Sequence, residues 1–596
     1  MLDLREITEQ EWKILRAIDP KTIPELSCAA ENIYIVASID EILNPIIRKN
    51  DVIVVCGAFF GDEGKGKIVD AIANHPDIRV IARVNSGENA GHTVWHDGRK
   101  YVFHLAPSGL LIPGKTNVIG PECVMDPVSF MEDELSQVLR DDITPDLVVG
   151  NVHIVAPYHK LADLARNGRS NSSTLKGMSP VHASKAVKAC VRLDQLFGSR
   201  DKLTRAIRRD LEFSYNPIMQ ITSEEELLER CAEINERAKK RDTPGIPSHL
   251  IGFLEAPTGE KADYLIDLYL QTVMNKQFPK RGDALRIIDT ALRQNEKVLL
   301  EAAQAYYLSN GVETHFGSST SANTTSAGTK AAAGYNQEKY RSATINVTKF
   351  PPSRVGRGAN PCGLVPQTFF SDRKYNSLDD LAGVCEDFDG IQAAFWKSIG
   401  ENGILKKEYY TDADGKHYLL CETMAISSSR KHGECGATTK KPRVLGIMDC
   451  VAQHHVNQKQ GPYLSISALD RGDEYDKIGL VVAYVVLREG ESNGATYMPG
   501  QIIRPGDQLP NEQVLENCLP VIKVMDGWKD DPIGGRKFQP GKDLPRALNN
   551  FIGVYAKITG SNVINFGNGQ DTKALVYIQK SEPDILTCCD YGEELD

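Results

Sequence analysis

A glycine-rich segment, GDEGKGK at residues 61–67, has the residue types and spacing of a phosphate-binding loop. It follows the apolar run DVIVVC at residues 51–56, so we expect a strand, then the loop, then a helix. Backbone N–H groups and a lysine at such a junction can hold phosphate oxygens. Ile68 stands where an ordinary loop has the Ser or Thr that binds Mg²⁺, and Asp62 places a carboxylate inside the loop. We expect that carboxylate to bind a metal cation or to accept a proton.

A second polar loop is predicted at residues 82–94, ARVNSGENAGHTV, again after apolar residues typical of a strand. Its chemically useful members are Asn85, Asn89, Gly91, His92 and Thr93. Glycine lets a backbone carbonyl approach a ligand closely, and imidazole can donate to a phosphate oxygen or transfer a proton near neutral pH. The alternative for both loops is a turn whose charges simply face water.

Length and charge restrict the classes of protein to which the chain could belong. With 596 residues, a net charge of −10 and a pI of about 5.8, it has no basic surface that recommends nucleic acid as a partner. The longest apolar run, at residues 478–487, is too short to span a membrane and is typical of a buried strand. We therefore expect a large enzyme with no nucleic-acid or membrane partner.

Cysteine usage predicts reduced thiols and a cytoplasmic protein. The chain has 13 cysteines but no C-x-x-C pair, and its first residues are acidic rather than those of a secretory leader. The adjacent Cys588 and Cys589 are interpreted as incidental. The pairs His92 with His96 and His454 with His455 lack a third ligand at suitable spacing, so no structural zinc is predicted.

Further motifs appear in an order that resembles the adenylosuccinate synthetase family, which joins aspartate to inosine monophosphate (IMP) using GTP. After GDEGKGKIVD and NAGHT come LLEAAQ ending at Gln304, TSANTT at residues 320–325, GECGATT at 433–439, LDRGDEYDKIGL from Leu469 and LPRALNNFI from Leu544. The resemblance runs from about residue 51 to about residue 580. Together these motifs are specific, although none after the first two would be specific alone.

The resemblance implies an α/β fold: a central, mainly parallel sheet flanked by helices, phosphate-loop-like, with helical insertions. We predict an N-terminal extension at residues 1–50, a catalytic domain at 51–585 and a tail at 586–596. Insertions are expected near 200–290 and 488–515, and such a long form resembles the version found in kinetoplastid protozoa. Ser223 and Glu226 form a capping-box pattern, so a helix is predicted to begin in the first insertion.

The resemblance also implies roles for three reactive residues. Asp62 matches the family's base, which removes the N1 proton of IMP so that O6 attacks the γ-phosphate of GTP. Lys65 and His92 would offset the charge on the transferring group, and His92 matches the catalytic acid. Asp62 and the carbonyl of Gly91 match ligands of one Mg²⁺ per subunit. The amine of aspartate would then displace phosphate from 6-phosphoryl-IMP.

The binding residues implied by the resemblance come from the whole length of the chain. Those for IMP are Asn89, Thr174, Lys188, Gln304, Thr320 and Lys441. Those for aspartate are Thr438, Thr439 and Arg443. Those for GTP are Gly61, Glu63, Gly64, Gly66, Lys67, Gly91, Thr93, Asp470, Asn568 and Gly569. The carboxylate of Asp470 would accept hydrogen bonds from guanine, whose donor pattern adenine lacks.

The chain departs from the family pattern at three places. Ala468 stands where a lysine stem usually covers guanine. Lys188 replaces an arginine that the family's homodimer donates across its interface, which keeps the charge but loses the bidentate fork. The aspartate loop reads TTKKPRV, with Lys440, Lys441 and Pro442 where the family has glycine and arginines.

Two other functions remain open at this point. One is a related enzyme that condenses aspartate with deoxyguanylate and lacks the loop carboxylate, so Asp62 argues against it. The other is a phosphate-loop NTPase or nucleotide sensor, which would give no role to the GATT and TSAN segments.

Overall fold

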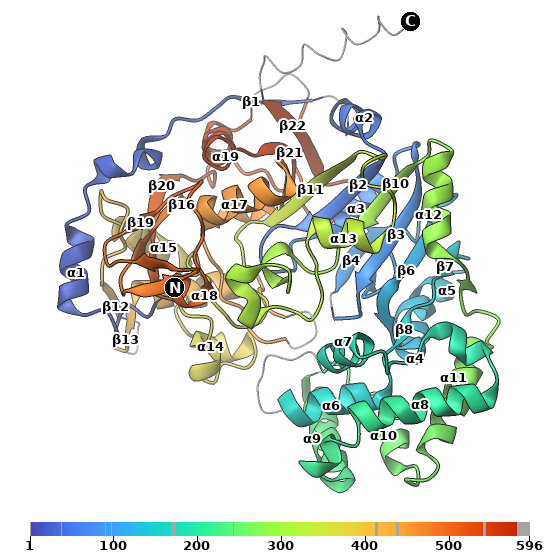
Figure 1. The fold of residues 1–596 in the computed structure, drawn as a ribbon. Coiled ribbons are helices and arrows are strands. Elements are labelled where there is room, and N and C mark those ends of the chain that lie inside the picture. The colour runs from blue at the N-terminus through green and yellow to red at the C-terminus, as the bar shows by residue number, and fades with distance from the viewer. Residues whose placement is uncertain are drawn as a thin grey trace, which may run out of the picture.

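The computed structural model describes residues 2–36, 39–89, 91–96, 98–167, 175–241, 243–411, 415–436, 440–539 and 544–580. The predicted site residues Thr174, Thr438 and Thr439 lie outside these ranges, as do Cys588 and Cys589. A 12-stranded sheet crosses the molecule, with helices on both sides (Figure 1).

The strands of this sheet confirm the predicted fold class. From one edge to the other they are β1 (Ile33–Ile35), β22 (Leu575–Lys580), β21 (Asn562–Gly567), β15 (Tyr463–Ser467), β11 (Ser342–Lys349), β2 (Val52–Gly57), β10 (Lys297–Glu301), β3 (Ile78–Ser86), β6 (Thr116–Met125), β7 (Leu147–Val149) and β9 (Lys280–Arg281), and β8 (His153–Ile154) also pairs with β6. Neighbours from β21 to β9 are parallel, whereas β22 is antiparallel to both β21 and β1.

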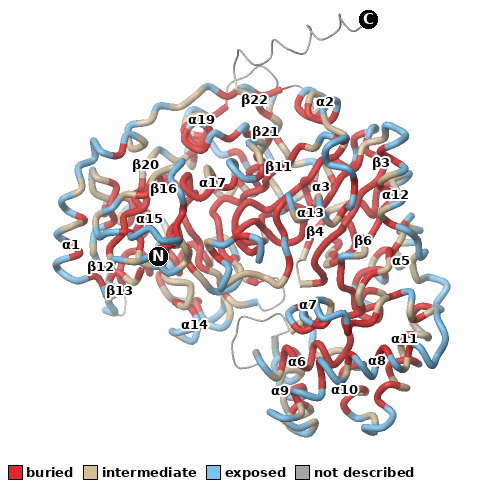
Figure 2. The backbone as a smooth tube through the Cα atoms, viewed as in Figure 1, coloured by how far each residue is buried: buried red, intermediate tan, exposed pale blue. Residues whose placement is uncertain are grey.

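Burial explains why the central strands are so apolar. Every residue of β2 is buried, as expected for a parallel strand covered on both faces. Ile53 and Val55 pack with α2 (Ile39–Lys49) and α3 (Lys65–Ala73), whereas Val52 and Val54 face α12 (Ala284–Arg293) and the end of α13 (Ser326–Ala332). Figure 2 shows the same result as buried backbone through the centre, with exposed segments on the outer helices.

A helical lobe lies next to one end of the sheet, below it in the view of Figure 1. Its helices are α6 (Pro157–Asn167), α7 (Met178–Ala186), α8 (Arg200–Ser214), α9 (Glu224–Arg241), α10 (Ser248–Glu255) and α11 (Lys261–Val273). The predicted helix start is confirmed, because α9 begins at Glu224 and the Glu226 N–H donates to Ser223 Oγ at 3.1 Å. The lobe's core joins Leu203, Phe253 and Leu265 to the rest of the apolar cluster around β6.

A second, smaller sheet lies on the other side of the molecule. Its long strands β16 (Lys477–Val486) and β20 (Cys518–Asp526) are antiparallel. The apolar run at residues 478–487 is therefore a buried strand, as predicted. No described helix has the length and apolar character needed to cross a membrane.

The N-terminal extension is part of the main fold. It contains α1 (Glu9–Arg16), β1 and α2, and β1 forms an edge of the central sheet. Leu4, Trp12, Leu15 and Ile23 are buried in the largest apolar cluster. The extension thus supplies both sheet and core.

One element prediction was wrong in its bounds. The polar run at residues 82–94 is a loop only at its middle, because β3 continues to Ser86 and β4 (His92–His96) starts at His92. Asn85 therefore belongs to a strand. His92 and Thr93 belong to the strand that follows the turn.

Candidate functional site

The phosphate-type loop lies between β2 and α3, as predicted. Gly61 and Gly64 have φ angles of 91° and 84°, in the left-handed region that glycine tolerates. The buried Glu63 accepts the N–H groups of Phe59 at 2.9 Å and Gly61 at 3.0 Å through Oε1. The Glu63 carboxylate thus shapes the loop from inside, and a Cβ at Gly57 would lie only 2.3 Å from its Oε2.

Asp62, the predicted base, is paired with Arg443. The side chain of Asp62 accepts a hydrogen bond from Arg443 Nη1, although the two residues are far apart in sequence. Burial alone would raise the pKa of Asp62, but the charges of Arg443, Lys349 and Lys65 lower it overall. Asp62 is therefore ionised at neutral pH, as a base must be before it accepts a proton.

His92, the predicted acid, lies against the start of α3. A Cβ at Gly66 would be 3.2 Å from the Thr93 carbonyl oxygen and 3.4 Å from the Cβ of His92. Gly66 therefore lets β4 approach the helix N-terminus closely. This close approach makes the imidazole a neighbour of the loop that carries Asp62 and Lys65.

The imidazole of His92 is held on both sides. Nδ1 contacts Glu301 Oε1 at the end of β10, and Nε2 lies 3.1 Å from Arg83 Nη1. Arginine can only donate, so this pattern assigns the ring proton to Nδ1. Glu301 is itself fixed by Ser108, whose N–H and Oγ donate to it at 2.8 Å and 2.7 Å.

Burial favours the neutral form of the His92 ring. Burial, the largest influence, lowers the pKa of His92 to about 4, with Glu301 opposing and Arg83 adding to the shift. For Glu301, burial would raise the pKa, but His92 and Arg83 bring it down to about 2. A carboxylate beside a neutral imidazole is poised to stabilise the imidazolium once phosphates arrive.

Three of the predicted IMP residues form one hydrogen-bonded group. Asn89 Nδ2 donates to Thr320 Oγ1 at 3.3 Å, and Gln304 Nε2 donates to Asn89 Oδ1 at 2.5 Å. Ser86 Oγ donates to Gln304 Oε1 at 3.1 Å. These amides and hydroxyls come from the ends of β3 and β10 and from the segment after β10, and they are uncharged groups suited to purine edges and phosphate.

The predicted guanine residues gather around another loop, at residues 567–574. Lys67 Nζ donates to the carbonyl oxygens of Gly569 and Ala574, each at 2.8 Å. Asn568 Nδ2 donates to the carbonyl oxygens of Ile533 at 3.2 Å and Arg536 at 2.8 Å.

Asp470 lies beside the segment at residues 533–536 that Asn568 contacts. A Cβ at Gly534 would be 3.8 Å from the Cβ of Asp470. Burial lowers the pKa of Lys67 to about 8, with Asp470 and Asp571 opposing the shift. In this structure the ammonium of Lys67 holds the loop, and its assignment to GTP stays a prediction.

The predicted aspartate site is described only at its flanks. Arg443 follows an antiparallel bridge between Cys435 and Pro442, which closes the loop that contains Thr438 and Thr439. Lys441 is partly exposed in this hairpin, and its carbonyl accepts the Gly436 N–H at 2.9 Å.

Glu434 anchors the hairpin through several contacts. It accepts from Lys349 at 2.6 Å, Ser353 at 2.9 Å and Arg471 at 2.9 Å. These charges bring Asp62, Glu434 and the base of the aspartate loop into one network.

Lys188 is separate from the other predicted IMP residues. It is exposed on the turn that follows α7, with a φ of 63°. Gly91 is partly exposed beside His104, and Thr93 is exposed on β4. The structure thus brings together the catalytic and purine residues, and leaves Lys188 at the surface.

Comparison with known proteins finds one family along nearly the whole chain. The family model described as adenylosuccinate synthetase matches residues 54–245 and 260–576. The chain belongs to the adenylosuccinate synthetase family. It is 47% identical over 580 residues to adenylosuccinate synthetase 2 of Trypanosoma cruzi, covering 94% of this chain and 93% of that one.

Two further comparisons extend this result. Adenylosuccinate synthetase of Trypanosoma brucei gambiense is 46% identical over 587 residues, which is 96% of each chain. The fully ligated adenylosuccinate synthetase structure from Plasmodium falciparum superposes with a TM-score of 0.62 at 21% identity, covering 88% of this chain and 99% of that one. The solved structure supports the fold, and the curated relatives confirm the predicted resemblance to the kinetoplastid long form.

Sequence reasoning missed several partners in this synthetase-family site. Glu301 was quoted within LLEAAQ, Arg83 within the run at residues 82–94, and Glu434 within GECGATT, yet none was given a role. A buried acid next to a recognised motif was the available signal for Glu301 and Glu434. Their partners depend on strand neighbours that spacing alone does not reveal.

Among the described residues, one group of side chains has the spacing of metal ligands. His159, Cys190 and Asp210 have ligand atoms within 4.8 Å of one another, and all three are buried. Asp210 accepts hydrogen bonds from Tyr158 at 2.8 Å and Ser214 at 3.0 Å, and also from Ser184. Hydroxyl donors thus already satisfy the carboxylate, and it needs no cation.

Proposed function

We propose that this protein ligates L-aspartate to IMP with GTP as co-substrate, through 6-phosphoryl-IMP, giving adenylosuccinate, GDP and phosphate. This makes it a carbon–nitrogen ligase of AMP biosynthesis. The observation that carries the proposal is the convergence of Asp62, the His92–Glu301 pair and the Asn89–Gln304–Thr320 group at the ends of neighbouring strands. A simple nucleotide hydrolase has no need of the last group.

In the first step of the proposed reaction, Asp62 acts as the base. Its carboxylate is ionised, and it accepts the N1 proton of IMP while O6 attacks the γ-phosphate of GTP. Arg443 occupies this carboxylate in the ligand-free protein. Because a carboxylate of the substrate aspartate offers the guanidinium fork the same two oxygens, its binding at Arg443 would free Asp62 by exchange of partners.

The second role belongs to His92 and Lys65 near the γ-phosphate. Approach of the phosphates raises the pKa of His92, and Glu301 stabilises the imidazolium that results. Protonated His92 then donates to the phosphate oxygens from Nε2, once Arg83 has moved off that atom. Lys65, buried 3.6 Å from Glu63, adds a second positive charge at the helix N-terminus.

A divalent cation fits the same loop. Carboxylate and carbonyl oxygens are the ligands that Mg²⁺ prefers, and Asp62 with the Gly91 carbonyl would supply them, one ion per subunit. The chemistry such an ion would supply is positive charge that neutralises the phosphates of GTP. The protein would supply the oxygens of Asp62 and Gly91 as ligands. It has no hydroxyl ligand at position 68, because that residue is Ile.

Binding of the three substrates follows the residues already described. Thr438, Thr439 and Arg443 would hold aspartate, Asp470 the guanine base, and Thr174 and Lys441 the IMP phosphate side. The exposed position of Lys188 is compatible with a homodimer in which it reaches the IMP site of a partner subunit, as the family resemblance implies. We also propose a cytoplasmic location, which the free cysteines among the described residues support.

The related reaction with deoxyguanylate is disfavoured by the carboxylate of Asp62. Ala468 has a φ of 55° and offers no lysine stem over guanine, so the preference for GTP over ATP rests on Asp470.

One experiment tests the reaction and its nucleotide together. The protein is incubated with IMP, aspartate and Mg²⁺, with GTP or ATP, and products are separated by chromatography. We expect adenylosuccinate with GTP, little with ATP, and none from Asp62→Asn. Phosphate release without adenylosuccinate would overturn the ligase assignment.

A further inference from the structure

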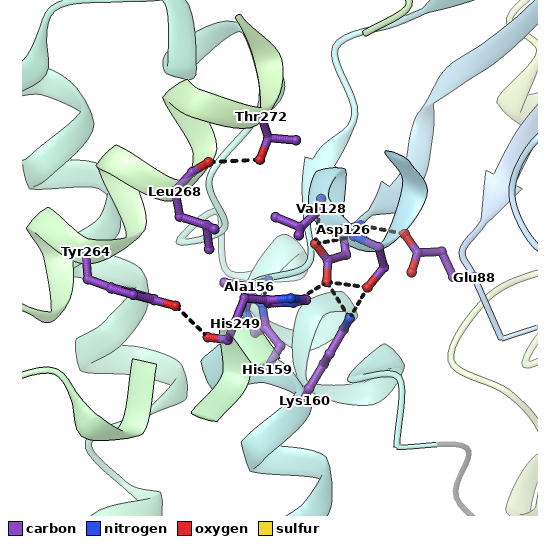
Figure 3. Close-up of polar contacts among 11 residues, drawn as sticks. Glu88, Asp126, Val128, Ala156, His159, Lys160, His249, Tyr264, Leu268 and Thr272 are labelled. Carbon is purple, nitrogen blue, oxygen red and sulfur yellow. Dashed lines mark hydrogen bonds and ion pairs between the residues drawn. The ribbon is translucent and has the colours of Figure 1, made fainter. Parts of the chain in front are cut away.

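A buried polar cluster joins the helical lobe to the loop that carries Asn89. Figure 3 shows the Asp126 carboxylate, at the end of β6, between Lys160 of α6 and His249 of α10. Lys160 Nζ contacts Asp126 Oδ2 directly, and His249 Nε2 lies 3.0 Å from the same oxygen. All three side chains are buried. The reaction described above uses none of them.

The backbone of Asp126 continues the path to the site. Its N–H donates to Glu88 Oε1 at 2.6 Å, and Glu88 immediately precedes Asn89 (Figure 3). The Asp126 side chain also caps the short helix α4 (Pro127–Ser129), accepting the Val128 N–H at 3.0 Å. Side chain and backbone of Asp126 are therefore fixed together. Asp126 thus links Lys160 and His249, through its carboxylate, to Glu88, through its backbone N–H.

His249 comes from a segment outside the common part of the family. The family model matches residues 54–245 and 260–576, and α10 lies between these ranges. Yet α10 packs against α6, and Phe253 and Leu254 are buried in the lobe's core. A helix outside the matched regions thus contributes a donor to the buried carboxylate of Asp126, and the backbone N–H of Asp126 contacts Glu88 beside Asn89.

We propose that His249 is a positioning residue for the IMP site, holding Asp126, Glu88 and the loop of Asn89 in the conformation that binds the nucleotide. The inference rests on the proposed function, because that function makes Asn89 an IMP ligand. A buried carboxylate that loses one of its donors shifts toward its remaining partner. Here the remaining partners of Oδ2 are Lys160 and the Ser129 hydroxyl, whereas Oδ1 still accepts the Val128 N–H. A shift toward Lys160 and Ser129 would carry the Asp126 backbone away from Glu88.

The test compares two substitutions at one position. His249→Leu removes the donor and keeps most of the bulk, whereas His249→Gln places an amide N–H at a similar reach. We expect the leucine variant to raise KM for IMP and the calorimetric Kd of IMP by about five- to tenfold. Its kcat and its KM for GTP should stay close to wild type. The glutamine variant should restore IMP binding.

Tyr264→Phe provides a matched control, because Tyr264 lies in α11 and contacts the backbone of His249 in α10. It removes the hydrogen bond from Tyr264 to the His249 carbonyl, at 3.1 Å, without touching Asp126. This variant should bind IMP normally. An equal loss in Tyr264→Phe, or an equal rise in KM for every substrate, would mean general loosening of the lobe and would overturn the inference.

The remaining outcomes are also decisive. A folded His249→Leu with wild-type IMP constants overturns the inference. If the leucine variant does not fold, His249→Asn, whose amide is too short to reach Asp126, replaces it in the comparison with glutamine. Failure of the proposed function is seen separately, because the wild-type protein would then make no adenylosuccinate whatever the variants do.

Discussion

Both reactive side chains are held by a partner of opposite character from a distant part of the chain. Asp62 is paired with Arg443, and His92 with Glu301. Neither partner lies in the same loop as the residue it holds. The acid and the base can therefore be tuned separately, and each partner predicts a distinct kinetic effect.

Replacing Glu301 by Gln should affect the acid. Burial lowers the pKa of His92 and Glu301 opposes this, so loss of the carboxylate lowers that pKa further. If protonated His92 is the acid, the alkaline limb of the kcat profile moves to lower pH, and kcat falls about ten- to a hundredfold. Ser108→Ala, which keeps the carboxylate charge, is the control. An unchanged pH profile would show that His92 is not the titrating acid.

Replacing Arg443 by Gln should affect both aspartate and the base. We expect KM for aspartate to rise about ten- to a hundredfold, because a charge-assisted hydrogen bond is lost. The pKa of Asp62 should rise, since Arg443 is the largest charge that lowers it, so the acid limb of the profile moves to higher pH. Arg443→Lys keeps the charge and should retain the pH profile while binding aspartate poorly. Unchanged aspartate kinetics in the glutamine variant would remove Arg443 from that site.

At the level of residues, the sequence predicted the reactive groups better than their partners. Asp62, His92, Asn89, Gln304 and Thr320 were all named, and the structure brings them together. The role of Glu301 was missed because it depends on β10 lying beside β3, which is a matter of strand order. The assignment of Glu63 and Lys67 to GTP stays a prediction, and what the sequence did not reveal is that both side chains hold loops.

The elements that form the site are polar where a core strand would usually be apolar. Asn85 lies inside β3 and donates to the Asn323 carbonyl oxygen at 2.7 Å and to Thr329 at 3.3 Å. Ser86 donates to Gln304. Asn and Ser are residue types that are common in loops and turns, so this polar run resembles a loop in composition. This explains why the run at residues 82–94 was predicted as one loop rather than two strand ends and a turn.

Lys67 of α3 holds two backbone carbonyl groups of the loop at residues 567–574. Lys67→Met should release it, because the carbonyl oxygens of Gly569 and Ala574 lose their shared donor. We expect KM for GTP to rise about tenfold, as for the loss of one or two hydrogen bonds, with KM for IMP unchanged. Lys573→Met, an exposed lysine of the same loop, is the control. Steady-state kinetics would contradict the assignment if both variants behaved alike.

At the level of the whole molecule, the N-terminal extension contributes to the core and to the central sheet, and the sequence did not predict this role. Trp12 is buried with Leu15 in the largest apolar cluster, and Glu11 accepts a hydrogen bond from Arg488 at 2.8 Å. The mainly parallel centre of the sheet was implied by the family resemblance. Its antiparallel edge could not be foreseen, because residues 33–35 pair with residues 578–580. The predicted domain boundaries stay predictions.

A substitution in this extension should therefore affect the stability of the whole protein. Trp12→Ala removes a large buried side chain and is expected to cost about 3–5 kcal/mol of unfolding free energy. Chemical denaturation followed by circular dichroism measures the loss. Lys13→Ala, at the exposed neighbouring position, should be neutral. If both variants unfold alike, the extension is not part of the cooperative core.

The pairing of β1 with β22 also has a consequence for how the protein is made. A ribosome adds about 5–20 residues per second, so the last strand emerges on the order of a minute after the first. During that time the partner of Ile33 and Ile35 does not yet exist. An unpaired strand and its apolar neighbours are prone to aggregate. The newly made chain must keep residues 33–35 shielded until residues 578–580 have been synthesised, and this makes it a natural client of chaperones that act during translation.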